Sequence, residues 1–108
     1  MVAVYVAPIP VTAAGPGGAA VVVAERQANE EIAAEVRSRS DEIGREFGVT
    51  ITFVAAGGDP YHELTRIATE VRADAVVVGA SMKAGHLLMG SLAVRLVRAG
   101  KWPVTVVP

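Results

Sequence analysis

The stretch AVVVGASMKAGHLLMGSLAVRLVRAGKWPVTVV, residues 75–107, contains a strand, a connection, a helix and another strand in that order. Its valine runs predict strands over Ala73–Val78 and Pro103–Val107. Between them, the spacing of apolar residues after Ser91 predicts a helix that Ser91 caps and that runs to Gly100. Two strands joined through a helix typically lie parallel in one sheet.

The amino-terminal part of the chain repeats this alternation. Val2–Ala7 is a short, valine-rich run that predicts a buried strand, and the dense glycine and proline of residues 11–18 predict a loop. Gly48 is expected to end the following helix, Ala19–Phe47, in a left-handed conformation. One apolar stripe supports this helix: Val21, Ala24, Ala28, Ile32, Val36, Ile43 and Phe47.

A second strand and a second helix follow. Val49–Ala55 has the β-branched character of a strand, and Asp59-Pro60 is a strong helix start with Asp59 as N-cap. Strands and helices therefore alternate along the whole chain, which predicts an α/β fold. We expect an open, Rossmann-like parallel sheet of about four strands with flanking helices, in a single domain over residues 1–108. The valine runs agree, because parallel strands are buried on both faces.

Composition restricts the class of protein. The chain has 108 residues, 52% hydrophobic and 19% charged, with a net charge of −1, which gives no footprint for nucleic acid. It has no cysteine, which excludes disulfides and thiolate metal sites. No apolar run reaches the ~18 residues of a membrane span, and the start MVAVYVAPIP lacks the features of a signal peptide. We expect a cytoplasmic protein that binds neither nucleic acid nor membranes.

The connection Gly79–Ser91 is the candidate binding site. It leaves the carboxyl end of a strand, where ligands bind in open α/β sheets. Its glycines let backbone N–H groups approach a ligand, and the helix that follows has a positive N-terminus. The hydroxyls of Ser81 and Ser91 and the charge of Lys83 suit a phosphate. The alternative is structural: the glycines permit tight turns, and Lys83 and His86 are solvated surface residues.

Two motifs with partial matches are rejected. Gly85–Ser91 has the paired glycines of a P-loop but lacks the lysine that contacts the terminal phosphates. Gly15–Ala20 fits a dinucleotide fingerprint, but it lies too far beyond the strand ending at Ala7. Two histidines without a suitable spacing, and no cysteine, predict no metal site.

The segments ADAVVVGAS and GSLAVRLVRAGKWPVTVVP, within Ala73–Pro108, resemble the carboxyl-terminal half of the universal stress protein family. The Gly58-Asp59-Pro60 helix start is also similar. The resemblance implies an adenine nucleotide α-hydrolase-like fold and ATP, with magnesium, bound at this connection. Gly79 matches the first glycine of the family's signature, and Gly90-Ser91 the closing pair beneath the phosphates. The implied nucleotide-binding residues are Val6, Ala7, Gly79, Ala80, Ser81, Gly85, Gly90, Ser91 and Leu92.

This chain departs from the family pattern in two ways. Gly79 and Gly90 are eleven residues apart, two fewer than in the full signature, and Met82 stands where a second glycine is expected. The family also begins with one more strand and helix, whose aspartate helps to hold the nucleotide, so the fold is expected to be truncated at its N-terminus. That strand lies between the first and third strands of this chain. The two strands then pair directly, or another chain fills the gap, or the sequence is a fragment.

Two functions fit these residues. The first is a regulatory module that binds ATP or a related adenine nucleotide and has at most slow hydrolysis, so that it is not a dedicated enzyme. The second is a nucleotide-free stress-response module that acts as a homodimer. The resemblance implies dimerisation through the last strand, Val104–Val107, which would form an unprotected sheet edge.

Overall fold

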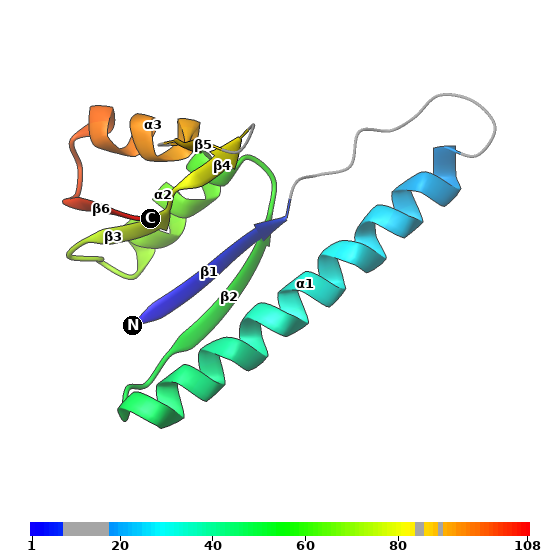
Figure 1. The fold of residues 1–108 in the computed structure, drawn as a ribbon, viewed down its shortest axis with the longest axis horizontal. Coiled ribbons are helices and arrows are strands. Elements are labelled where there is room, and N and C mark those ends of the chain that lie inside the picture. The colour runs from blue at the N-terminus through cyan, green and yellow to red at the C-terminus, as the bar shows by residue number, and fades with distance from the viewer. Residues whose placement is uncertain (8–17, 84–85, 89) are drawn as a thin grey trace. The chain divides into compact units, whose positions relative to one another are not determined.

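Figure 1 shows the computed structural model, which describes residues 1–7, 18–83, 86–88 and 90–108. Strands and helices alternate, and the two longer strand pairs are parallel, which confirms the predicted α/β class. The chain divides into two compact units, Met1–Asp59 and Pro60–Pro108, which are described in turn. Most of the loop predicted at 11–18, and Gly85 of the candidate site, lie outside the described residues.

The first unit is a strand–helix–strand element. It consists of β1 (Val2–Ala7), α1 (Gly18–Phe47) and β2 (Thr52–Gly57). β1 and β2 pair in parallel over their whole lengths, and α1 runs alongside them (Figure 1). The strand and helix predicted at 2–7 and 19–47 are confirmed, whereas β2 begins three residues later than expected.

The late start of β2 follows from the way in which α1 ends. Gly48 has a φ of 65°, the left-handed conformation expected for the residue after a helix. The Val49 N–H group then donates to the Gly44 carbonyl oxygen at 2.9 Å. Val49 therefore closes the helix instead of opening the strand.

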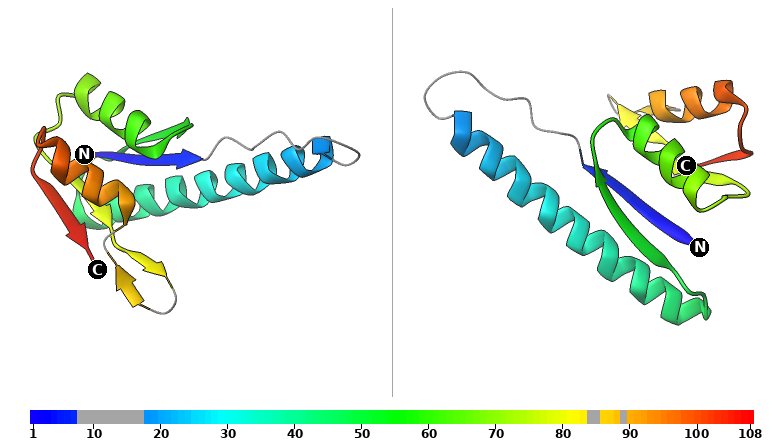
Figure 2. Two further views of the ribbon diagram at one scale, coloured as in Figure 1. Left: turned by 90° about the horizontal axis from the view of Figure 1, so that it is seen from above. Right: turned by 180° about the vertical axis from the view of Figure 1, so that it is seen from behind.

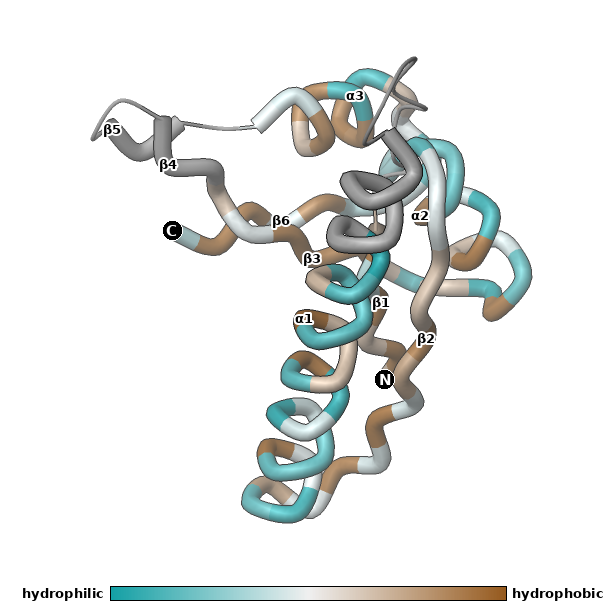
Figure 3. The backbone as a smooth tube through the Cα atoms, turned by 90° about the vertical axis from the view of Figure 1, so that its right-hand side faces the viewer, coloured by the Kyte–Doolittle hydropathy of each residue, from teal (hydrophilic) through white to brown (hydrophobic). Residues whose placement is uncertain are grey.

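The buried side of α1 differs in part from the predicted apolar stripe. Ser40 is only 8% exposed, and its hydroxyl donates to the Val36 carbonyl at 2.8 Å. Ile32 and Phe47 are 44% and 69% exposed. Figure 3 shows apolar and polar residues alternating from turn to turn along this helix. The helix is amphipathic as expected, but its most buried residues are Ser40 and Gly44 instead of the residues of the apolar stripe. The side chains of Val21 and Ala24 lie outside the described residues.

The second unit is built around one apolar core. Its elements are α2 (Pro60–Glu70), β3 (Val76–Gly79), β4 (Ser81–Lys83), β5 (His86–Leu88), α3 (Ser91–Ala99) and β6 (Val104–Val107). Ala68, Val76 and Leu96 form the buried centre. Half-buried neighbours pack around it: Tyr61, Leu64, Ala73, Val78, Leu92, Trp102 and Val104. β3 and β6 pair in parallel, as two strands joined through a helix should.

Three predictions for this unit are corrected by the structure. β3 begins at Val76 instead of Ala73, because Arg72 adopts a left-handed φ of 53° in the turn after α2. The connection predicted as a loop contains the antiparallel hairpin β4–β5 (Figure 2). Ser91 is not the N-cap of α3: Gly90 occupies that position, and Ser91 is the first helical residue.

Candidate functional site

The carboxyl end of β3 is the first part of the candidate site. Gly79 pairs with Val107 of β6, and the Ala80 N–H group donates to the Val107 carbonyl at 2.7 Å. A Cβ placed on Gly79 would meet no described atom within 4 Å. Packing among the described residues therefore does not require a glycine here.

The N-terminus of α3 is the second part. Gly90 is extended, with φ −67° and ψ 161°, and within the described part of the chain no side chain caps the helix. The hydrogen bond from Val94 N–H to the Gly90 carbonyl, 3.2 Å long, marks the first turn. The N–H groups of Ser91, Leu92 and Ala93 precede it, and within the described residues they have no recorded acceptor.

The side chains at this helix start face different surroundings. Ser91 is exposed, so its hydroxyl is available to a ligand, whereas Leu92 packs against the core of the unit. Leu92 could therefore serve a ligand only through its backbone N–H group. A helix N-terminus with donors and no cap suits an anion.

The hairpin between these two parts reduces the predicted cradle. Ser81 pairs with Leu88 and Lys83 with His86 in the antiparallel ladder. Part of the backbone N–H groups of Ser81–Lys83 and His86–Leu88 is used by that ladder and cannot converge on a phosphate. Gly85 lies outside the described residues. Outside this ladder, the N–H groups of Ser91, Leu92 and Ala93 remain without an acceptor among the described residues.

Val6 and Ala7, assigned to the adenine by resemblance, belong to the first unit. They pair with Ala56 and Gly57 of β2, and the Ala7 carbonyl accepts the Gly58 N–H at 2.9 Å. One lone pair of that carbonyl is therefore used within the unit. The backbone groups of Val6 point to the opposite edge of β1, because successive residues alternate.

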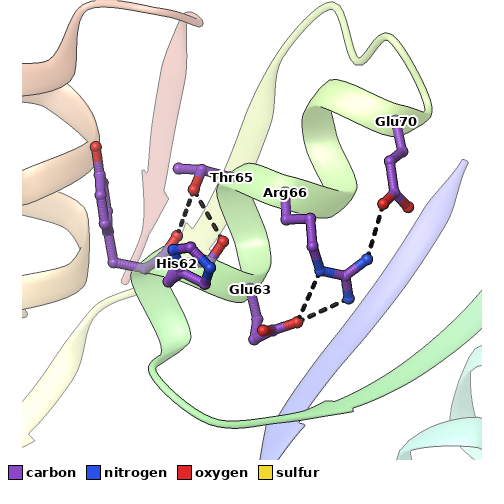
Figure 4. Close-up of polar contacts among 6 residues, drawn as sticks. His62, Glu63, Thr65, Arg66 and Glu70 are labelled. Carbon is purple, nitrogen blue, oxygen red and sulfur yellow. Dashed lines mark hydrogen bonds and ion pairs between the residues drawn. The ribbon is translucent and has the colours of Figure 1, made fainter.

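A polar cluster on α2 was not predicted. The Arg66 guanidinium bonds Glu63 at 2.7 Å and Glu70 at 2.9 Å, while the Thr65 hydroxyl donates to the Tyr61 and His62 carbonyls (Figure 4). The hydrogen bond to Glu63, and then that to Glu70, raises the pKa of Arg66. The i, i+3 and i, i+4 spacing in the sequence is the signal for such pairs. Arg66 and Glu70 are exposed, Glu63 is partly buried, and the three are paired with each other, which indicates a solvated helix face instead of a binding site.

The first unit has a groove of about 510 Å³ between α1 and β2. Phe53 and Ala55 of β2 lie in it, and the Arg37 guanidinium stacks over the Phe53 ring at 5.2 Å from its centroid. Its charged lining residues balance, two basic against two acidic: Arg37, Arg45, Glu30 and Asp41. The groove therefore lacks the net positive charge that a phosphate would require.

Two further classes of site were sought in the described residues. They include no group of three or more histidine, aspartate or glutamate side chains placed to hold a metal ion. No described helix is both long enough and apolar enough to cross a membrane.

Parallel strands with covering helices, and a glycine-marked connection from a strand end to a helix start, define this protein as an α/β domain with a Rossmann-like arrangement of its elements. A model of the universal stress protein family matches residues 1–108, and the chain belongs to that family. The resemblance recognised in the sequence is thereby confirmed.

A solved structure supports the fold. The chain is similar to the crystal structure of a protein from the universal stress protein family from Burkholderia pseudomallei, with a TM-score of 0.64 and 24% sequence identity. The similarity covers 99% of this chain and 72% of that one. No curated protein matches the chain.

Proposed function

We propose that this protein is a cytoplasmic regulatory module that binds ATP or a related adenine nucleotide at the connection Gly79–Ser91. Family membership supports a role in the stress response. The nucleotide would act as a signal, and at most slow hydrolysis is expected, so the protein is not proposed to be a dedicated enzyme.

The open N-terminus of α3 carries this proposal. Gly90 has no side chain that could accept the N–H groups of the first turn, and among the described residues no side chain caps the helix. The helix dipole adds about half a positive charge at the same place. A phosphate group would satisfy these donors, and the exposed Ser91 hydroxyl would add one further hydrogen bond.

Different residues of the proposed site would contact different parts of the nucleotide. Gly90, Ser91 and Leu92 would hold phosphates through backbone N–H groups, and Gly79 would leave space for them at the strand end. Ala80 already donates its N–H to Val107, so its part would be to shape the site. Val6 and Ala7 are assigned to the adenine by family resemblance alone. Magnesium would bind together with the phosphates.

Calorimetry tests this proposal. The purified chain is titrated with ATP and with ADP, with and without magnesium. Gly90→Asp places a negative charge at the helix N-terminus and should weaken binding by at least about tenfold. Ala99→Asp adds the same charge at the exposed far end of α3 and should leave the affinity unchanged. Absence of heat and of a thermal shift at millimolar ATP would refute nucleotide binding.

A second candidate function is a nucleotide-free homodimer that pairs through β6. The inner edge of β6 is used, because the Pro103 and Val107 carbonyls accept N–H groups from Val76 and Ala80. The backbone groups of Val104 and Val106 therefore point to the outer edge, where the described structure has no strand. Val106→Pro would remove one outward donor and should dissociate such a dimer. Light scattering that shows a monomer throughout the micromolar range would remove this candidate.

A further inference from the structure

A contact between α2 and α3 lies beside the proposed nucleotide site. The Arg95 guanidinium of α3 lies over the Tyr61 ring of α2, with 4.1 Å between its central carbon and the ring centroid. Tyr61 is the second residue of α2 and Arg95 the fifth of α3, so the contact joins the early turns of the two helices. Both residues belong to the second unit, which also contains the connection Gly79–Ser91.

Arg95 shares a face of α3 with Ser91. Four residues of α-helix turn through about 400°, so the two side chains are about 40° apart around the axis, and their Cα atoms are about 6 Å apart along it. Long side chains on a helix point back toward its N-terminus. We therefore expect the exposed Arg95 side chain to extend toward the level of Ser91, where the N–H groups of the first turn lie.

The ring beneath Arg95 is held in place by the core. Tyr61 is half-buried and packs against the cluster of Ala68, Val76 and Leu96. An arginine on the surface of a helix has many rotamers, and a cation–π contact with a fixed ring restricts them. The charge of Arg95 is thereby held near the start of α3 before a ligand arrives, and a group already in place loses less entropy on binding.

Arg95 retains donors for a phosphate in this position. A guanidinium has five N–H donors in a planar fork, so it can donate to a phosphate in addition to its other contacts. The carboxylate of Glu63, two residues after Tyr61, is paired with Arg66 at 2.7 Å. The negative charge of Glu63 is therefore balanced within α2 and does not offset that of Arg95.

We propose that Arg95 is a specificity-determining residue of the nucleotide site: its charge, positioned by Tyr61, makes the affinity rise with the number of phosphates on the ligand. This inference rests on the proposed function, because it concerns the ligand at the N-terminus of α3. The N–H groups of the first turn suit one phosphate of any nucleotide. Arg95 would add a charge-assisted contact to the phosphates beyond it, so that the site selects ATP over ADP and ADP over AMP.

Calorimetry with ATP, ADP and AMP tests this inference, at constant ionic strength and without magnesium, so that the ligands differ in charge. Arg95→Met removes the charge but keeps a long side chain, whereas Arg95→Lys keeps the charge. Arg98→Met is the matched control, because Arg98 lies on the same face as Ser91 but about 10 Å along the axis.

The expected result is a change in selectivity. Arg95→Met should lower the ATP affinity about tenfold and the AMP affinity less than about threefold. Arg95→Lys should keep most of the preference for ATP, and Arg98→Met all of it. Tyr61→Leu removes the ring and should reduce the preference as well, whereas an unchanged preference would show that Tyr61 does not position Arg95. Circular dichroism checks each fold, and Arg95→Gln replaces Arg95→Met if that variant does not fold.

The failure of this inference can be distinguished from that of the proposed function. A wild-type chain that binds none of the three nucleotides refutes both. If the wild type binds ATP and AMP equally, or Arg95→Met lowers all three affinities by the same factor or not at all, only the inference is wrong. An equal loss of selectivity after Arg98→Met would also overturn it, because the effect would then come from the net charge of the chain.

Discussion

Gly44 illustrates how one missing side chain shapes the first unit. It is buried in the last turns of α1, and a Cβ at this position would lie 2.7 Å from the Val49 carbonyl oxygen. Real Cβ atoms do not approach backbone oxygen so closely, so the turn into β2 would have to move. The glycine is therefore required by the approach of the following turn and not by its own conformation.

We expect Gly44→Ala to lower the free energy of unfolding by about 1–3 kcal/mol, the usual cost of overpacking. Helix propensity alone predicts the reverse, a gain of up to about 1 kcal/mol. Urea denaturation followed by circular dichroism distinguishes the two signs. A variant as stable as the wild type would show that the turn yields without cost.

Gly79→Ala is the matched substitution at a glycine with open surroundings. No described atom lies within 4 Å of the new Cβ, so we expect the free energy of unfolding to change by less than about 0.5 kcal/mol. If Gly79 leaves room for a nucleotide, the ATP affinity should nevertheless fall. An unchanged affinity by calorimetry would indicate that the phosphates do not approach this residue.

Gly48 and Gly44 show what the sequence can and cannot predict for single residues. Gly48, directly after an apolar helix, was expected to be left-handed, and its φ of 65° confirms this. Gly44 lies within a helical pattern, and nothing local marks it. Its role depends on a turn that folds back on the helix, which no periodicity encodes.

At the scale of elements, the periodicity of apolar residues and the positions of glycine and proline predicted most of the helices and strands. α1 and β1 agree with expectation within one residue, and α2 begins at Pro60 as the Asp59-Pro60 pair indicated. The strands of the hairpin were missed because each has only three residues, too few for an alternating pattern to stand out. In the candidate site, sequence located both ends of the connection but assigned the cap of α3 to the wrong residue.

The cap of α3 depends on backbone conformation and not on side-chain chemistry. A serine caps a helix only from the non-helical residue before it, and the structure gives that position to Gly90. Gly90→Ser would supply the missing oxygen. We expect it to stabilise the chain by a few tenths of a kcal/mol and to weaken ATP binding, because the new hydroxyl competes for the same N–H groups. Thermal melting and calorimetry measure the two effects, and tighter ATP binding would contradict the proposed phosphate position.

At the scale of the whole molecule, the alternation of strands and helices and the parallel pairing of strands joined through a helix were predictable, but the residue register of each pair was not. Alternating periods of two and 3.6 residues indicate an α/β class, since each element carries its own pattern. The pairing of β1 with β2, and of β3 with β6, joins residues far apart in the chain.

We propose that residues 1–108 nevertheless unfold as one domain, and the chain offers a separate reporter for each unit. Its one tryptophan, Trp102, packs against the core of the second unit, whereas the 30-residue helix α1 of the first unit dominates far-ultraviolet circular dichroism. A single domain should give coincident urea transitions by fluorescence and by circular dichroism.

Leu96→Ala extends this comparison to the coupling between the units. Leu96 is 1% exposed in the core of the second unit, and its truncation should cost about 2–5 kcal/mol. In one cooperative domain both transitions move to lower urea together, because the α1 signal depends on the same unfolding equilibrium. If only the Trp102 transition moves, the units unfold independently and the single-domain proposal is wrong.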